Sequence, residues 1–256
     1  GSRFVISIDP GILKEAYTGR LYVVLARNPG PEPRLSMGEW FGGPQVLAMD
    51  VANLAPGQSI ALGSESLSFP ASFKDIPKGT YTVQAVARRS TDTPSPGKGA
   101  GDLYSEPRVI EFAPASGDRE PAMPIEPSAI PLALTKVVAE PGFQESARIR
   151  LVEIVSPSLS AFYGREVKIR AGVCLPVGWK DDPEQRYTTL YFITGFGGDH
   201  NSARSTSRSM GKLADNVLLV VPDPSCALGH SVFADSENNG PRGQALMQEL
   251  IPAVEN

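Results

Sequence analysis

The first half of the chain alternates between hydrophobic and polar residues in short segments separated by turn-forming residues. The alternating segments span residues 3–8, 20–26, 46–49, 59–62, 80–87 and 109–112. A period of two is typical of strands with one buried face, and many short strands favour an antiparallel β-sandwich. Because the Cys–Trp–Cys spacing of a true immunoglobulin domain is absent, we predict only an immunoglobulin-like, all-β sandwich for residues 3–112.

Two hydrophobic runs in the second half do not alternate. Residues 189–194 and 216–222 carry no charge, which is typical of short strands buried on both faces. Between them lies the turn Gly195-Phe196-Gly197-Gly198, followed by a predicted helix over residues 199–214 with Asp199 as its N-cap. Strand, glycine turn, helix and strand in this order predict a parallel crossover, with the turn at the carboxyl end of the sheet.

A proline-rich stretch separates these two halves. Residues 113–131 contain five prolines among small and charged residues, and proline fixes φ and stiffens an extended chain. We therefore predict three parts: a β-sandwich domain over 3–112, a linker over 113–131 and a second domain over 132–256.

The second half also contains phrases that resemble a known family. Segments 147–155 and 165–176 alternate and predict an antiparallel strand pair. The chain then reads SPSLSAFYGREV at 156–167, VCLPVGW at 173–179, RYTTLYFITGF at 186–196 and FADSENNGPRGQALMQELIPAVE at 233–255. These phrases resemble the esterases related to esterase D, S-formylglutathione hydrolase and the mycolyltransferases. The resemblance implies the front part of an α/β-hydrolase fold for residues 132–256.

The same resemblance implies where a site would lie. In that family, the residue after a glycine in this turn contributes a backbone N–H to the oxyanion hole, and the matching positions are Gly195 and Phe196. The candidate substrate contacts in the same region are Gly197, His200, His230, Asp235, Ser236 and Asn239. Two alternatives stay open: His230 could stabilise its loop, and the last three residues could be turn formers.

The nucleophile of such an esterase is missing from the chain. No G-x-S-x-G motif occurs, and the partial match around Ser36 lacks the first glycine and a preceding buried strand. The family order is Ser, acid, His, whereas His200 and His230 both precede the position of the nucleophile. We therefore expect that the nucleophilic Ser and the catalytic acid and His are not in this chain, which would be the front part of a longer protein and inactive alone.

Composition excludes several other classes of function. The net charge is −4 and no basic stripe occurs, which argues against nucleic acid as a partner. No run approaches the roughly 18 apolar residues of a membrane span. Cys174 and Cys226 cannot build a disulfide framework, and no metal-ligand spacing occurs. We therefore predict no metal and no cofactor.

The sequence thus favours an esterase-type serine hydrolase that acts on a carboxylic ester, either a small molecule or one linked to a polysaccharide. The alternative is a non-catalytic carbohydrate- or protein-binding module with a degenerate hydrolase half. A sandwich ahead of an esterase domain is typical of exported proteins, so we expect a periplasmic or extracellular location. The chain opens Gly1-Ser2, so any signal peptide would already be removed. The strand at 189–194 would form an apolar sheet edge through which copies could pair into an oligomer.

Overall fold

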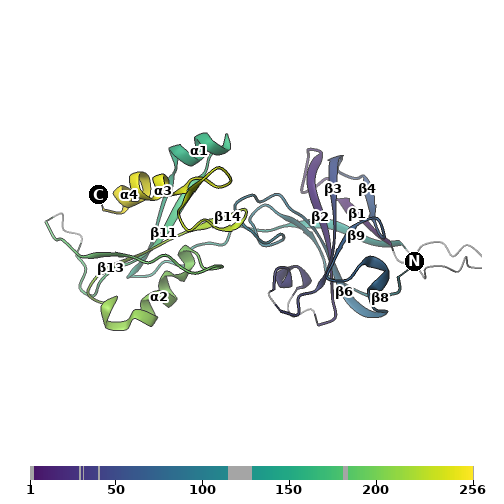
Figure 1. Cartoon of the computed structure of the whole chain (residues 1–256), viewed down its shortest axis with the longest axis horizontal. Helices are drawn as coiled ribbons and strands as arrows, with labels where there is room; N and C mark the ends of the chain where they lie inside the picture. The colour runs from purple at the N-terminus through teal and green to yellow at the C-terminus, as the bar shows by residue number, and fades with distance from the viewer. Residues whose placement is uncertain are drawn as a thin grey trace, which may run out of the picture. The chain divides into compact units, whose positions relative to one another are not determined.

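The computed structural model of the chain describes residues 3–28, 30, 32–39, 41–114, 129–180 and 184–255. It contains two compact units (Figure 1). The first comprises Gly1–Thr91 and Ser95–Glu140, and the second comprises Asp92–Pro94 and Pro141–Asn256. This division differs from the expected one, because residues 129–137 belong to the first unit. Of the expected linker, residues 115–128 lie outside the described residues.

Strands of the first unit join into one hydrogen-bonded sheet of nine strands in the described residues. Its order is β4-β1-β9-β7-β6-β2-β3-β5, and β8 pairs with β6. Only β1 and β9 run parallel among these pairs. The strands are β1 (Arg3–Ile8), β2 (Tyr17–Ala26), β3 (Gln45–Leu54), β4 (Ser59–Leu62), β5 (Leu67–Phe69), β6 (Gly79–Ala87), β7 (Leu103–Ser105), β8 (Arg108–Phe112) and β9 (Ala129–Val137), with 3-10 turns η1 (Pro33–Ser36) and η2 (Phe73–Asp75).

The period-two pattern explains the core of this unit. In β1 the side chains of Phe4, Ile6 and Ile8 are fully buried, and the residues between them are more exposed. In the parallel partner β9, Ile130 and Leu132 are buried in the same cluster. Each such side chain contributes about 1.5–3 kcal/mol by leaving water. Through this pairing and this shared core, β9 belongs to the first unit.

The predicted immunoglobulin-like sandwich is wrong. Hydrogen bonds join all nine described strands into a single sheet instead of two stacked antiparallel sheets. The parallel β1–β9 pair also departs from the antiparallel pattern. Alternation predicts which face of a strand is buried, but it does not determine which strands pair. The sandwich prediction is wrong because it assumed a pairing that the alternation does not specify.

The second unit contains a four-stranded mixed sheet of order β10-β11-β13-β12. Only β12 and β13 run parallel in it. Its strands are β10 (Ile149–Val155), β11 (Lys168–Cys174), β12 (Thr189–Tyr191) and β13 (Leu218–Pro222). Two short ribbons pair β14 (Ser225–Cys226) with β15 (Gly229–His230) and β16 (Asp235–Ser236) with β17 (Gly240–Pro241). The helical segments are α1 (Pro157–Tyr163), η3 (His200–Ser202), α2 (Ala203–Met210), η4 (Gly211–Leu213), α3 (Arg242–Ala245), the π-helical turn η5 (Leu246–Leu250) and α4 (Ile251–Glu255).

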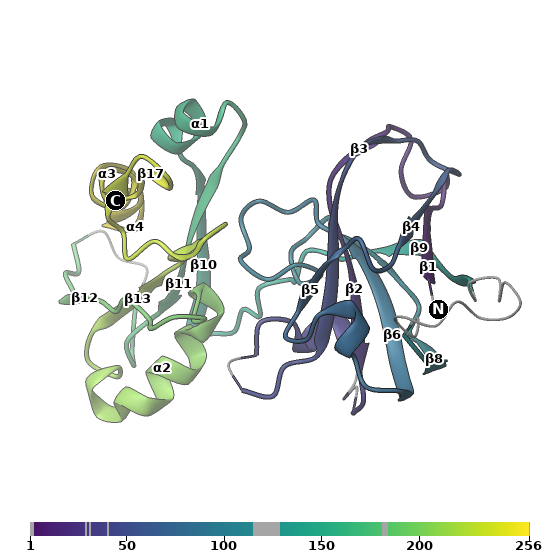
Figure 2. The same ribbon diagram turned by 45° about the vertical axis from the view of Figure 1, so that its right-hand side comes forward.

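Short helices cover both faces of this sheet, as Figure 2 shows for α1 and α3 on one side and α2 on the other. On the first face Leu159 of α1 and Leu250 of η5 pack in a cluster with Ala171 of β11. On the second face Ala203 of α2 packs in a cluster with Leu219 of β13. No helix in the described residues is long and apolar enough to cross a membrane.

The predicted front part of an α/β-hydrolase fold is also wrong. Strands make up 38% of the structure, and the helices are few and short. The helix α2 has eight residues, and only Ala203 among them is buried. The strand predicted over 189–194 shrinks to the edge strand β12, whose residues are only partly buried. Polar helix sequences and frequent glycine and proline limit how much helix this unit forms.

Candidate functional site

The glycine turn after β12 is exposed at the carboxyl end of that strand. The N–H of Gly198 donates to the carbonyl of Gly195 at 3.0 Å, which closes the turn. Gly197 has a φ of 85°, a left-handed conformation that glycine adopts without strain. The Phe196 side chain is 65% exposed, and an added Cβ on Gly229 would meet its ring at 2.5 Å. The turn therefore lies directly against β15.

His230 of β15 ties the two loops together. Its Nε2 lies 2.8 Å from the carbonyl oxygen of Thr194, and its Nδ1 lies 3.0 Å from the backbone N of Val232. Nδ1 must accept from that N–H, so the ring proton sits on Nε2 and donates to Thr194. Both ring nitrogens are engaged in these two hydrogen bonds, which corresponds to the loop-stabilising alternative for His230. A substrate could contact this ring only through its carbon atoms.

The loop after His230 holds unusual backbone conformations. Val232 and Phe233 have φ values of 49° and 53°, which cost side-chain-bearing residues about 1–3 kcal/mol each. Ser231 fixes them: its N–H donates to Pro224 and its Oγ accepts from the N–H of Phe233. Strain of this kind concentrates at binding and catalytic loops.

A histidine and a carboxylate pair with each other beyond the ends of β12 and β13. His200, which follows the glycine turn, places Nδ1 2.7 Å from Oδ2 of Asp223, which follows β13. Burial disfavours the charged form of Asp223, but hydrogen bonds from His200 and Ser225 outweigh it and lower the pKa of this carboxyl. An ionised carboxylate accepts the Nδ1 proton, and this leaves Nε2 of His200 as the basic nitrogen.

The surroundings of His200 fix its ring. Phe143 stacks on it with ring centroids 5.7 Å apart. An added Cβ on Gly172 of β11 would lie 2.2 Å from the carbonyl oxygen of His200, so the strand passes directly beneath this residue. Asp199 acts as the N-cap predicted from sequence, because its side chain accepts from the N–H of Asn201. Asp223 is not among the residues predicted from sequence, although an aspartate directly after a buried strand is a signal for such a site.

The remaining candidate residues make contacts within their own loop. Asp235 Oδ1 accepts from the N–H groups of Gly243 and Gln244 at 2.7 and 3.1 Å, so it caps the start of α3. Ser236 Oγ accepts from the N–H of Asn239 at 3.0 Å. The contact between Ser236 and Asn239 stabilises a turn, in line with the turn-forming alternative for these two residues, whereas Asp235 stabilises a helix start.

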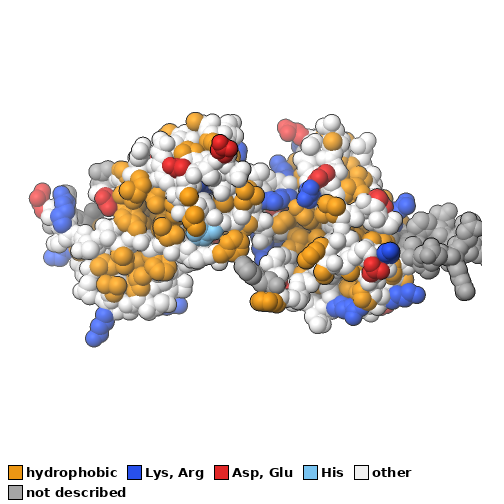
Figure 3. Space-filling model, in the orientation of Figure 1, with side chains coloured by type: hydrophobic (Ala, Val, Ile, Leu, Met, Phe, Trp, Pro, Cys, Tyr) orange, Lys and Arg blue, Asp and Glu red, His pale blue; other side chains and the backbone are white. Residues whose placement is uncertain are grey.

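Hydrophobic side chains are exposed on both loops beside the glycine turn. The exposed fraction is 37% for Phe192, 45% for Ile193, 69% for Leu228 and 65% for Val232. Figure 3 shows hydrophobic side chains around a histidine on this unit. Exposed apolar residues grouped on adjoining loops mark a surface that binds apolar groups.

One buried hydroxyl at this place lacks a hydrogen bond. Thr194 is 7% exposed, and its Oγ1 is the one buried side-chain polar atom without a partner in the described residues. An unsatisfied buried hydroxyl costs about 1–3 kcal/mol. An added Cβ on Gly198 would lie 3.0 Å from this oxygen, so the strained group lies under the glycine turn.

Metal ligands are not grouped here. Within the described ranges no cluster of three or more His, Cys, Asp or Glu side chains has metal-binding geometry. Cys174 and Cys226 are buried free thiols, and Cys174 Sγ lies 3.1 Å from Ser207 Oγ.

Comparison with known proteins adds no family. No protein-family model matches the sequence, and no curated protein matches it. The esterase resemblance therefore stays a prediction that rests on the quoted phrases.

Proposed function

We propose that the second unit contributes the oxyanion and acyl-binding part of a carboxylic ester hydrolase of the serine type. The observation that carries the proposal is the exposed glycine turn over Gly195–Gly198, which His230 ties to a strained loop. Backbone N–H groups of such a turn stabilise the negative oxygen that forms when a nucleophile adds to an ester carbonyl. In this role we assign the N–H of Phe196, as the resemblance implies, and that of Gly197.

The exposed hydrophobic side chains beside the turn support an acyl-binding role. Phe192, Ile193 and Leu228 would cover the hydrocarbon part of an ester held at the turn. The substrate would be a small-molecule ester or an ester on a polysaccharide, and the protein would act outside the cytoplasm. We assign no nucleophile in this chain.

The pair of His200 and Asp223 has the arrangement of a general base that an acid orients. His200 follows the glycine turn in the sequence. In the family that the chain resembles, the base instead follows the nucleophile. The base is therefore either His200, oriented by Asp223, or a histidine that follows the nucleophile as in that family. Substitution of His200 distinguishes these two possibilities.

The experiment is labelling of the source protein and of this chain with a fluorophosphonate probe, read by intact mass. One adduct on a species heavier than 27.3 kDa supports a serine hydrolase whose nucleophile lies elsewhere in the protein. An adduct on the 27.3 kDa chain would contradict our assignment and show that a serine of this chain is the nucleophile, and its loss in His200→Gln would assign the base to His200. No adduct on either species, together with no hydrolysis of p-nitrophenyl esters, refutes ester hydrolysis and leaves the non-catalytic binding module.

We also propose that copies of the chain pair through β12. This strand is an edge of its sheet, and Ile193 beyond it is 45% exposed; an unpaired apolar edge is a template for strand addition. Sedimentation at micromolar concentration should show a dimer that Ile193→Lys dissociates. A monomer for the unsubstituted chain contradicts this proposal.

A further inference from the structure

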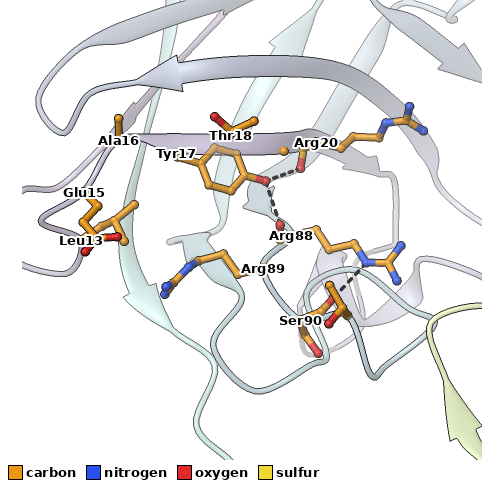
Figure 4. A pocket seen from close by; sticks show the side chains of 11 residues that line it. Leu13, Glu15, Ala16, Tyr17, Thr18, Arg20, Arg88, Arg89 and Ser90 are labelled. Atoms are coloured by element: carbon orange, nitrogen blue, oxygen red, sulfur yellow. Dashed lines mark hydrogen bonds between the residues drawn. The ribbon is translucent and has the colours of Figure 1, made fainter. Parts of the chain in front are cut away.

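The first unit contains a cavity of about 390 Å³ to which nothing above gives a role (Figure 4). This volume falls within the range of small-molecule sites. The lining residues come from the start of β2 and from the segment after β6. They include Glu15, Tyr17, Thr18, Arg20, Arg88 and Arg89.

A β-bulge in β2 forms one side of the cavity. The pairing of β2 with β3 shifts register between Tyr17 and Gly19, and bulges commonly redirect side chains near sites. The absence of a side chain on Gly19 admits the Tyr17 hydroxyl, which would lie 2.6 Å from an added Cβ. That hydroxyl lies 3.0 Å from the carbonyl oxygen of Arg20 and 2.9 Å from that of Arg88. The tyrosine is therefore a fixed wall that connects both sides.

A buried carboxylate fixes the opposite side. Asp102 is fully buried, and its Oδ1 accepts from the N–H groups of Arg89 and Ser90, each at 2.7 Å. Its Oδ2 accepts from the N–H of Gly97 at 2.8 Å. Two of these charge-assisted hydrogen bonds hold the backbone that carries Arg89, and the third ties the same carboxylate to Gly97. The cavity is thus preorganised on both sides.

The charges around the cavity leave one guanidinium available. Arg20 makes two hydrogen bonds of 2.7 Å to Asp50, and Nε of Arg88 donates to the carbonyl of Ser90 at 3.2 Å. The guanidinium of Arg89 has no hydrogen bond or ion pair with any other described residue. Figure 4 shows it extending to the side of the cavity where Leu13 and Glu15 lie, whereas Arg20 and Arg88 extend the opposite way.

We propose that this cavity binds the carboxylate of a small hydroxylated ligand, a uronic acid or hydroxy acid, with Arg89 as its ion-pair partner. The planar guanidinium matches a carboxylate in shape and charge. Asp50 neutralises Arg20, so the lining keeps two guanidinium groups, those of Arg88 and Arg89, against the one carboxylate of Glu15. This balance favours a single negative charge over a phosphate dianion. The hydroxyl oxygen of Thr18 accepts from the N–H of Asn53 at 3.0 Å, so its proton remains to donate to the ligand. The proposal is independent of ester hydrolysis, because it concerns the first unit alone.

The test is isothermal titration of the full chain with D-glucuronate. We expect saturable binding, at least tenfold weaker binding in Arg89→Gln, and no detectable binding of neutral D-glucose. The matched control is Arg3→Gln, because Arg3 is an exposed arginine at the start of β1 outside the cavity; its affinity should equal that of the unsubstituted chain. Circular dichroism and the thermal midpoint verify that both variants fold.

Three results would overturn the proposal. The first is no binding of glucuronate, and the second is equal weakening by Arg89→Gln and Arg3→Gln. The third is tighter binding of inorganic phosphate than of glucuronate, which would contradict the assignment to a carboxylate. Arg89→Lys keeps the charge but loses the planar fork, so an affinity between those of the unsubstituted chain and Arg89→Gln further supports the assignment.

Discussion

Replacement of Asp102 by Asn tests whether one buried carboxylate holds the loop that carries Arg89. The substitution keeps the shape of the side chain and removes its charge. An Asn oxygen can still accept from Arg89 and Ser90, but its amide nitrogen would then face the N–H of Gly97, a donor against a donor. One N–H therefore loses its partner in a buried place, and two hydrogen bonds lose their charge assistance.

These losses add up to a measurable destabilisation. A buried unpaired N–H costs about 1–3 kcal/mol, and a bond to a charged group is stronger than a neutral one by about 1 kcal/mol. For Asp102→Asn we therefore expect the free energy of unfolding to fall by about 3–5 kcal/mol. Urea unfolding followed by circular dichroism measures this, and amide exchange should show faster exchange at Arg89, Ser90 and Gly97.

The matched control is Asp50→Asn in the same unit. Asp50 is an exposed acid paired with Arg20, and surface ion pairs contribute little to stability. We expect a much smaller change in the unfolding midpoint for this variant. Equal effects of the two substitutions, or unchanged exchange at the three amides, would refute the reasoning about the buried carboxylate.

Two further predictions concern the second unit. Gly172→Ala places a methyl group 2.2 Å from the carbonyl oxygen of His200, so it should destabilise the unit by about 1–3 kcal/mol in thermal unfolding. The control is Gly142→Ala, because Gly142 has open space around it. Equal thermal midpoints for the two variants would contradict the close approach at Gly172. Asp223→Asn should flatten the acid side of the stability profile. Because the folded-state pKa of Asp223 is lowered, its stabilisation is present above the ordinary aspartate value of about 3.9 and is lost as pH falls toward the folded value. Thermal midpoints measured between about pH 3 and 6 check this, and identical profiles for both proteins would refute it.

Local patterns in the sequence predicted much of the secondary structure. The segments 3–8, 80–87 and 109–112 correspond to β1, β6 and β8 with small shifts at their ends, since a half-buried strand requires alternation. The missed helix α1 also had local signals: Ser156 as N-cap, proline in the first turn and Gly164 in a left-handed conformation at the end. These residues follow the usual rules for helix ends.

Pairing between distant strands could not be predicted in the same way. β1 lies beside β9, more than 120 residues later, and nothing in either segment alone specifies this partner. The shortening of the predicted strand 189–194 has a related cause. Among the described strands, β12 lies at the sheet edge and pairs only with β13. Phe192 and Ile193 therefore continue the hydrophobic run while remaining partly exposed. A hydrophobic run shows that burial is favourable, while the neighbouring chain decides whether burial occurs.

In the candidate site too, local features could be predicted from the sequence and contacts between distant residues could not. The glycine turn and the Asp199 cap are local features, and the sequence predicts both. The contacts that give the site its chemistry join residues far apart: His200 to Asp223, and His230 to Thr194. The first contact leaves a basic nitrogen on a fixed ring, and the second uses both nitrogens of its ring to hold two loops. Two histidines that look equivalent in the sequence therefore have different roles, because a carboxylate partner leaves Nε2 of His200 available whereas backbone partners occupy both nitrogens of His230. If either histidine transfers a proton, the geometry favours His200.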